Sequence, residues 1–200
     1  LFAKFYDMAD MARSILPKHF YTRPTLQVAE ELLGKFLVVS KNDTEISRMI
    51  TEVEAYNGFE DKASHASRGL TKRNAPMFEE GGIWYVYFVY GMYDMLNIVT
   101  GKKGYPAAVL IRGACPVRDG VSNGMESITG PGKLTKTLGI TRAYNGLRAL
   151  RRSGLWIEDR GFVIPQKSVK KCARVGVDYA GPVWSKKKYR FFIDSVISLK

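Results

Sequence analysis

The alternation of apolar and polar positions in residues 46–56, ISRMITEVEAY, predicts a β-strand. The apolar run 35–40, KFLVVS, predicts a second strand, and the polar residues 41–45 predict the turn of a hairpin. Successive side chains of a strand point to opposite faces. One face is expected to carry Met49, Thr51, Val53 and Ala55, and the other Ile50, Glu52, Glu54 and Tyr56. The first face is apolar enough for the core, whereas two acids and a ring on the second are typical of a pocket wall.

The same kind of pattern predicts further elements along the chain. Residues 25–33 predict a helix that Thr25 caps and Gly34 ends. The aromatic run 82–100 predicts two strands around a turn at Gly91. The remaining segments are a strand at 107–113, a loop at 114–129, a helix within 130–140 after the turn Gly130–Gly132, and strands at 161–165, 173–181 and 189–194.

Helices mixed with mostly antiparallel strands, without regular βαβ alternation, predict an α+β fold. We expect one domain over residues 1–200, with a mostly antiparallel curved sheet, flanking helices, a protruding β-hairpin and a candidate amino-terminal arm at 1–22. The polar segment 57–82 has little regular pattern, and so long a stretch is uncommon in a compact domain unless it has a function.

Composition indicates the kind of partner. Lys and Arg total 31 against 19 acidic residues, and a net charge of +12 on a small domain favours a polyanion such as nucleic acid. The alternative is a basic protein without such a partner. Cys115 and Cys172 form neither a disulfide framework nor a zinc spacing, which predicts reduced thiols in an intracellular protein. No apolar run approaches the ~20 residues of a membrane helix, and the first residues do not resemble a signal peptide.

Glu54 is the first candidate for chemistry. A carboxylate that is partly desolvated beside a ring becomes a better base, because burial raises its pKa. The alternative is a solvated or salt-bridged strand residue, and Glu52 could pair with an arginine or lysine in the same way. His65 is isolated from the second histidine, His19, so no histidine metal site is expected.

Tyrosines and basic residues form the second group of candidates. Tyr85 and Tyr87 point the same way from a strand, and such a stripe is either core or a stacking surface. Tyr90 adjoins the predicted turn at Gly91, where a ring cannot be deeply buried and could wedge between bases. Four basic residues flank the glycine-bearing loops and could contact phosphates or be solvated surface charges: Arg68, Lys72, Arg73 and Lys133. Two more basic runs predict a charged helix end at 148–154 and a hairpin turn at 185–190.

The motifs follow one another in a specific order: TEVEAYNGFEDKASHASRG, RNAPMF, WYVYFVYGMYDMLNIV, AAVLIRG, GPGKLTKTLGI and ARVGVDYAG. In this order they resemble the alkyladenine (3-methyladenine) DNA glycosylase family, over about residues 23–194. That family cleaves the N-glycosidic bond of damaged purines in double-stranded DNA, such as 3-methyladenine, 7-methylguanine and hypoxanthine. The resemblance therefore implies a monofunctional hydrolase that flips the base out of the helix and needs neither a cofactor nor a metal.

The resemblance also implies a role for individual residues. Glu54 matches the general base, and Arg112 matches a residue near the catalytic water. Tyr56, His65, Tyr87 and Asn97 match residues around the extruded base, Asn97 being the one that crowds the amino group of guanine. Tyr90 matches the side chain inserted into the duplex, and Met92 and Tyr93 share its hairpin. Arg68, Arg73 and Lys133 are expected to bind DNA.

Two rival interpretations remain open at this stage. One is a basic nucleic-acid-binding module that stacks bases on its tyrosines without catalysis, and the other is an inactive descendant of the family. The chain departs from some relatives in a shorter 114–129 segment, in Gly132 of GPGKL where they have serine, and in its carboxyl end. We expect a monomer that acts inside the cell, in the cytoplasm or nucleoid of a bacterium or in the nucleus of a eukaryote.

Overall fold

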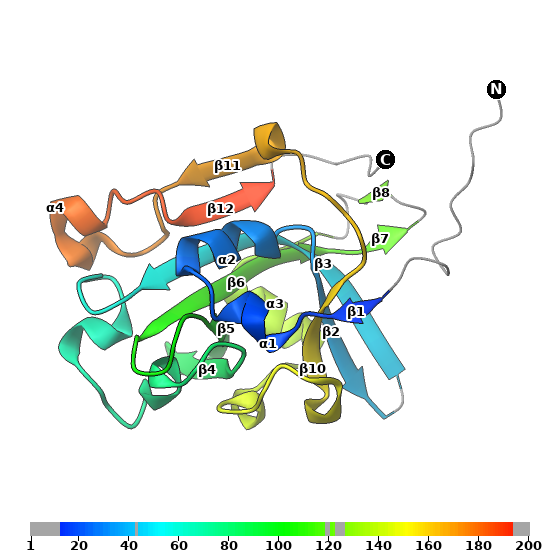
Figure 1. The fold of residues 1–200 in the computed structure, drawn as a ribbon, viewed down its shortest axis with the longest axis horizontal. Coiled ribbons are helices and arrows are strands. Elements are labelled where there is room, and N and C mark those ends of the chain that lie inside the picture. The colour runs from blue at the N-terminus through cyan, green and yellow to red at the C-terminus, as the bar shows by residue number, and fades with distance from the viewer. Residues whose placement is uncertain (1–12, 43, 119–120, 123–126, 194–200) are drawn as a thin grey trace.

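The main sheet of the protein is open and antiparallel, and helices pack against it (Figure 1). The computed structural model describes residues 13–42, 44–118, 121–122 and 127–193. Along the sheet the strands follow the order β1-β10-β2-β3-β6-β5-β4, with β12 and β11 added beside β3 and with β9 beside β6. The predicted α+β fold is therefore confirmed.

The strands have the bounds β1 Ser14–Ile15, β2 Phe36–Lys41, β3 Thr44–Asn57, β4 Trp84–Val89, β5 Tyr93–Val99, β6 Ala107–Cys115, β7 Val117–Arg118, β8 Val121–Ser122, β9 Ile128–Thr129, β10 Leu155–Asp159, β11 Val169–Cys172 and β12 Arg190–Ile193. The α-helices are α1 Lys18–Tyr21, α2 Thr25–Leu32, α3 Pro131–Leu138 and α4 Gly181–Trp184. Short 3₁₀ helices are η2 His65–Arg68, η3 Ala75–Phe78, η5 Arg142–Tyr144, η6 Arg151–Ser153, η7 Gln166–Ser168 and η8 Asp178–Ala180.

The main core lies between the sheet and helices α1, α2 and α3. Val28 and Leu32 of α2 and Leu134 of α3 are fully buried, and they share one apolar cluster with the inward side chains of β3 to β6. In Figure 1, α2 crosses over β3 and β6. The burial of one face by helices leaves the other side of β3 free to carry polar groups.

A β-bulge in β3 changes the predicted distribution of its side chains. The pairing with β6 shifts register on either side of Glu52, so the strict alternation breaks near Thr51. Ile50 therefore joins Val53 and Ala55 in the main core, whereas the sequence prediction placed Ile50 beside the acids. Glu54 and Tyr56 follow the bulge and keep a common face, and Glu52, which lies within the bulge, stays linked to Glu54 through their shared partner Arg112.

The hairpins agree with the sequence predictions. Strands β2 and β3 pair from Lys41 and Thr44 onward, and β4 and β5 pair around the turn at Gly91. Helix α2 begins at Thr25, the first residue of the predicted range, but Pro24 rather than Thr25 occupies the cap position. The hydroxyl of Thr25 instead accepts a hydrogen bond of 3.1 Å from Thr100.

Several predictions for the last third of the chain were wrong. Residues 161–165 and 173–181 are not strands, whereas β10 and β11 were missed. Phe162 packs without a strand partner, against Phe36 with ring centroids 5.4 Å apart, and Val163 is exposed. Residues 185–190 connect α4 to β12 rather than turn a hairpin, and 148–154 contains η6. The loop predicted at 114–129 is shorter than expected, because β6 reaches Cys115 and β9 begins at Ile128. Residues 119–120 and 123–126 of this segment lie outside the described part of the chain.

The amino-terminal segment is held on the sheet from residue 13 onward. Strand β1 pairs with β10, and Leu16, Phe20 and Tyr21 are buried. Residues 1–12 of the predicted arm lie outside the described residues. Both cysteines are free thiols, with Cys115 buried and Cys172 half-buried.

Candidate active site

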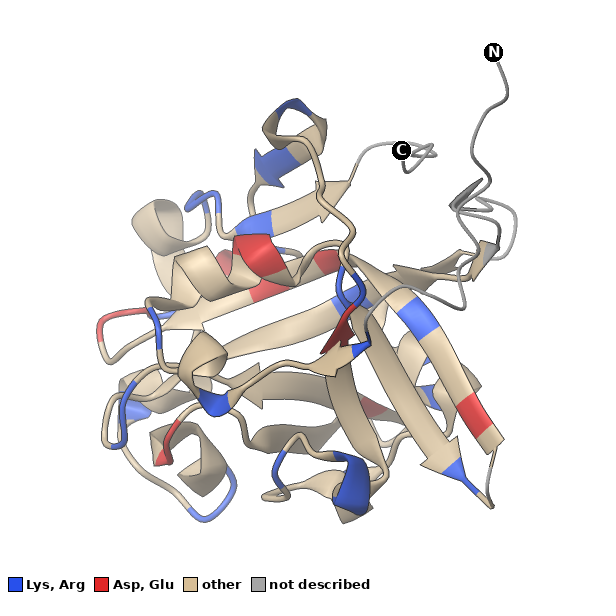
Figure 2. Cartoon of the chain, turned by 45° about the vertical axis from the view of Figure 1, so that its right-hand side comes forward, with Lys and Arg blue, Asp and Glu red and all other residues tan. Residues whose placement is uncertain are grey.

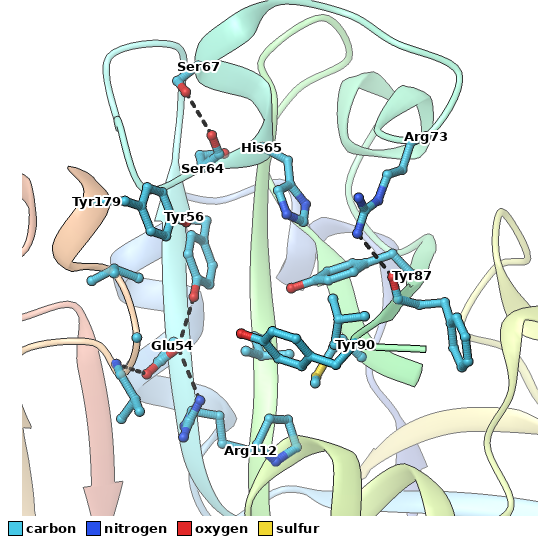
Figure 3. A pocket seen from close by; sticks show the side chains of 18 of the residues that line it. Glu54, Tyr56, Ser64, His65, Ser67, Arg73, Tyr87, Tyr90, Arg112 and Tyr179 are labelled. Carbon is cyan, nitrogen blue, oxygen red and sulfur yellow. Dashed lines mark hydrogen bonds and ion pairs between the residues drawn. The ribbon is translucent and has the colours of Figure 1, made fainter. Parts of the chain in front are cut away.

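A cavity of about 750 Å³ opens where β3, the segment 57–82, the β4–β5 hairpin and the loop after β11 meet. Glu54 and Tyr56 of β3 form one wall, and His65, Tyr87 and Tyr179 are among the other lining residues (Figure 3). A smaller cavity of about 40 Å³ shares Tyr56, His65, Tyr87 and Tyr179 with it, so the two spaces adjoin. The volume is in the range of ordinary small-molecule sites.

Glu54 is held rigidly by its strand. Its partners in the sheet are Arg190 on β12 and Leu110 on β6, so the backbone is bonded on both sides. The carboxylate accepts hydrogen bonds from Tyr56 Oη at 2.9 Å and from the backbone N–H of Val175 at 2.8 Å. Arg112 is its charge partner, with Nη1 3.4 Å from Oε2. A catalytic group on a paired strand is positioned more precisely than one on a loop.

The environment of Glu54 perturbs its ionisation. Burial raises the pKa of this carboxyl, and it outweighs the lowering by Arg112, by the N–H of Val175 and by Tyr56. Although Glu54 lines the cavity, none of its surface is exposed. The carboxylate thus combines a raised proton affinity with three contacts that fix its orientation. Both properties suit a general base.

Arg112 bridges the two acids of this face. Its Nε lies 2.9 Å from Oε1 of Glu52, and Arg190 contacts the same carboxylate atom at 3.6 Å. Glu52 is therefore an ion-pair partner, as one of the sequence alternatives proposed. It does not line the cavity, so the structure separates the roles of the two neighbouring glutamates.

Aromatic rings surround the space in front of Glu54. The ring centroids of His65 and Tyr87 are 4.6 Å apart, and those of Tyr85 and Tyr87 are 5.1 Å apart. Nδ1 of His65 lies 3.0 Å from the hydroxyl of Tyr85. Desolvation and then the charge of Arg73 lower the pKa of His65, so its imidazole is neutral at neutral pH. His65 therefore contributes an uncharged ring to the wall of the cavity.

Asn97 contributes to the smaller, deeper cavity. It is buried, and its Nδ2 donates hydrogen bonds of 3.1 Å to the carbonyls of Tyr85 and Met95. Burial raises the pKa of Tyr85 to about 12. The phenol beside Asn97 therefore stays protonated, and the polar groups of this region keep fixed hydrogen-bonding roles.

The β4–β5 hairpin presents Tyr90 at the mouth of the cavity. Tyr90 is 86% exposed and adopts a positive φ of 52°, and Gly91 follows with a φ of 66°. The N–H of Met92 donates to the carbonyl of Val89 at 3.1 Å, which closes a tight turn of the type I′ pattern. A tyrosine in the left-handed region is unusual and carries backbone strain.

The other residues of this hairpin differ in their environment. Met92 is 64% exposed, whereas Tyr93 is 37% exposed and its ring lies beside Gly132 of α3. A Cβ at Gly132 would lie 2.6 Å from the ring of Tyr93, so glycine at this position makes room for that ring. Gly132 is a position at which we expected from the sequence a departure from some relatives, and the structure gives it a packing role.

The predicted DNA-binding cations occupy different places. Arg68 and Arg73 line the cavity, but Lys133 lies exposed on α3 and does not. Arg73 donates to the carbonyl of Phe88 at 3.1 Å and lies over the ring of Tyr87, so it also supports the hairpin. Figure 2 shows that Lys and Arg lie on many separate segments of the chain. The basic residues are therefore spread over the chain and are not confined to one segment.

Sequence reasoning missed the contribution of the loop after β11. Val175 donates to Glu54, and Tyr179, which is 68% exposed, lines the cavity with its hydroxyl bound to the carbonyl of Ala63 at 2.9 Å. Beneath them, Arg174 and Asp61 form a fully buried ion pair. These residues lie within two of the quoted motifs, but the prediction of a strand at 173–181 concealed their loop geometry.

Two further observations concern the described part of the chain. Its side chains contain no group of three His, Cys, Asp or Glu residues placed to hold a metal ion. Among its helices, none has both the length and the apolar character that a membrane crossing requires.

Comparison with known proteins gives consistent results. Residues 19–196 match the family described as methylpurine-DNA glycosylase (MPG). A protein of Methanocella arvoryzae is 47% identical over 176 residues, covering 84% of this chain and 86% of its own length. One of Myxococcus xanthus is 44% identical over 178 residues (89% of each chain), and one of the Wolbachia of Brugia malayi is 53% identical over 137 residues (68% and 76%). All three bear the name "Putative 3-methyladenine DNA glycosylase". The chain therefore belongs to the methylpurine-DNA glycosylase family and is a DNA glycosylase.

Proposed function

We propose that this protein removes alkylated or deaminated purines from double-stranded DNA by hydrolysing the N-glycosidic bond, with Glu54 as the general base. 3-Methyladenine, 7-methylguanine and hypoxanthine are the proposed substrates. The observation that carries the proposal is the placement of Glu54 on the wall of a ring-lined cavity, with the exposed Tyr90 at its mouth. A module that only binds nucleic acid gains nothing from a carboxylate there, because a carboxylate repels phosphate.

The damaged nucleotide must leave the helix before it can reach Glu54. Rotating a nucleotide out of the stack costs a few kcal/mol, and the cost is smaller for a damaged pair. In our proposal Tyr90 enters the space that the nucleotide vacates, since its ring is exposed and lies at the cavity. Met92 is exposed on the same turn and would contact the neighbouring base pair.

The cavity then selects the base by its charge and shape. A purine alkylated on a ring nitrogen carries positive charge, and aromatic faces attract cations. Tyr56 and Tyr87 supply such faces, and the neutral imidazole of His65 adds a ring that does not repel the cation. Asn97 lies at the deep end, where a larger exocyclic substituent would meet a side chain whose amide is fixed by two carbonyls.

Hydrolysis needs one proton acceptor. A water oxygen forms a bond to C1′ of the sugar while Glu54 accepts the proton of that water, and the bond between C1′ and the base breaks with its electron pair leaving on the base. An alkylated base, which carries positive charge, leaves as a neutral molecule, whereas hypoxanthine must also take up a proton as it leaves; in both cases an abasic site remains. The negative charge of Glu54 also offsets the positive charge that develops on the sugar.

Water reaches Glu54 only after a rearrangement, because the carboxylate has no exposed surface in this structure. Of its three contacts, that with Arg112 is the longest, at 3.4 Å. We propose that binding of the extruded nucleotide displaces this contact and admits a single water between Arg112 and Glu54. Exclusion of other water strengthens the electrostatic effects in the site.

The proposed partner is duplex DNA, which Arg68, Arg73 and Lys133 would contact through its phosphates. We further propose that the protein acts as a monomer within the compartment that holds the DNA.

The test uses duplexes that each contain one lesion, together with an undamaged duplex. The proposed function predicts release of the free base and an abasic site that alkali converts into a strand break, without breakage before alkali. Binding of the lesion duplexes without any abasic product would instead support the nucleic-acid-binding module. Strand breakage without alkali would contradict the monofunctional mechanism.

A further inference from the structure

Arg174 is a buried charged residue close to the site, and its function is not explained by contact with the cavity, which it does not line. The side chains of Arg174 and Asp61 are both fully buried. The pairing is bidentate, with Nη1 2.5 Å from Oδ2 and Nη2 2.7 Å from Oδ1 of Asp61. Asp61 also accepts the backbone N–H groups of Asn57 and Ala63, so its own loop is fixed. Such a pair costs solvation energy, and its retention calls for an explanation.

The contacts of Arg174 converge on the two hydrogen-bond donors of Glu54. Its Nη1 donates to the carbonyl of Ala55, the residue between Glu54 and Tyr56, at 2.8 Å. Its guanidinium carbon lies over the ring of Tyr56, 4.7 Å from the centroid. The next residue in the chain is Val175, whose N–H is the other donor to Glu54. One side chain thus fixes β3, the ring of Tyr56 and the backbone of Val175.

We infer that Arg174, paired with Asp61, is a positioning residue that holds both hydrogen-bond donors of Glu54 in place. This inference rests on the proposed function, because it gives a reason for the orientation of the proposed base. Arginine is required rather than lysine, since one ammonium cannot bond both oxygens of Asp61, reach the carbonyl of Ala55 and stack on Tyr56.

The ionisation of Glu54 reports on this role. The donors of Tyr56 and Val175 favour the charged carboxylate, so their displacement moves the protonation of Glu54 to higher pH. The titratable and charged groups that face or surround Glu54 are Glu52, Tyr56, Tyr87, Arg112, Arg174 and Arg190. A lysine at position 174 keeps the positive charge, so a change in Arg174→Lys reports on hydrogen bonding and packing rather than on lost charge.

The chain offers a matched control in Arg160. It pairs with Glu158, whose Oε2 accepts from both Nε at 3.0 Å and Nη2 at 2.8 Å, and the pair is nearly fully buried. Its guanidinium carbon lies 4.3 Å from the centroid of the Phe36 ring. None of these residues lines the cavity. Arg160→Lys therefore perturbs a comparably buried ion pair without touching the donors of Glu54.

The experiment follows the carboxyl carbon of Glu54 by NMR titration of the full chain, and separately the single-turnover rate of base release against pH. In Arg174→Lys we expect the midpoint of the Glu54 titration to move to higher pH. The acid limb of the profile of base-release rate against pH should move in the same direction. The plateau rate should fall on the order of 10- to 100-fold. Arg160→Lys should leave both midpoints at their wild-type positions.

If Arg174→Lys does not fold, the double variant Asp61→Asn with Arg174→Gln removes both charges and should show the same upward displacement. An unchanged or lower Glu54 midpoint in a folded Arg174 variant overturns the inference, as does an equal displacement in Arg160→Lys. Absence of base release by the wild type would overturn only the proposed function, because the Glu54 titration needs no substrate.

Discussion

Replacing Tyr90 by asparagine should make the protein more stable and worse at capturing damaged DNA. Tyr90 has a φ of 52°, in the left-handed region that disfavours bulky residues by about 1–2 kcal/mol and that asparagine tolerates. Its ring is 86% exposed, so its removal sacrifices little packing. We expect a gain of about 1 kcal/mol in the free energy of unfolding, which raises Tm by about 2–4 °C in a chain of this size.

The loss of binding follows from the role of the ring. Stacking of an aromatic side chain on a base contributes about 1–3 kcal/mol, which corresponds to about 5- to 150-fold in affinity. Thermal unfolding and the fluorescence anisotropy of a labelled lesion duplex at fixed salt measure the two effects. The affinity for an undamaged duplex should change much less, because phosphate contacts dominate it.

The β2–β3 hairpin supplies a control. Asn42 occupies the same backbone region there, with a φ of 47°, and it does not line the cavity. Asn42→Tyr should lose about as much stability as Tyr90→Asn gains and leave lesion affinity unchanged. Wild-type capture of the lesion by Tyr90→Asn would refute the wedge role, and a loss of stability would refute the argument from strain.

Three further predictions concern the walls and surface of the site. Gly132→Ala brings a Cβ to 2.6 Å from the Tyr93 ring. Overpacking of this kind should lower the free energy of unfolding, measured by thermal unfolding, by about 1–3 kcal/mol, and it should weaken lesion binding by displacing the hairpin. Unchanged stability and unchanged lesion binding would contradict the packing account. The pKa of His65 measured by NMR should lie below 6.5. Because the unfolded chain then binds the proton more strongly than the folded protein, the stability that the neutral imidazole contributes is lost as pH falls below about 6.5. His65→Gln should abolish this pH dependence. The affinity for duplex DNA should fall linearly with salt on logarithmic axes, whereas a flat response would argue against phosphate contacts.

The sequence was sufficient to predict the elements that have strong local signals. The strand at 46–56, the turn at Gly91 and the helix after Gly130 all depend on neighbouring residues, and each is present. The exposure of Tyr90 followed from its position beside a turn glycine. These parts of the fold depend on the periodicity of apolar residues and on the residue types that favour turns, and both can be read from a single sequence.

The parts that could not be predicted depend on distant contacts. The bulge that moves Ile50 into the core arises from pairing with β6, about 60 residues away in the sequence, and has no local signal. Arg174 lies 113 residues from Asp61, so the ion pair beneath Glu54 is visible only in three dimensions. The apolar alternation at 173–181 resembled a strand, but the loop uses it to place Val175 and Tyr179 at the cavity.

The central claim is that the carboxylate of Glu54 removes a proton from the attacking water, and Glu54→Gln tests it most directly. Glutamine has nearly the same shape, and its oxygen can still accept the N–H of Val175, but it cannot act as a base. Glu45→Gln, on the same strand but outside the cavity, is the control.

The decisive measurement is the single-turnover rate at which each protein, in excess over a lesion duplex, releases the alkylated purine. The account predicts that Glu54→Gln binds the duplex within a few-fold of wild type and releases the base at least about 100-fold more slowly, while Glu45→Gln is unaffected. Release by Glu54→Gln at the wild-type rate would contradict the account.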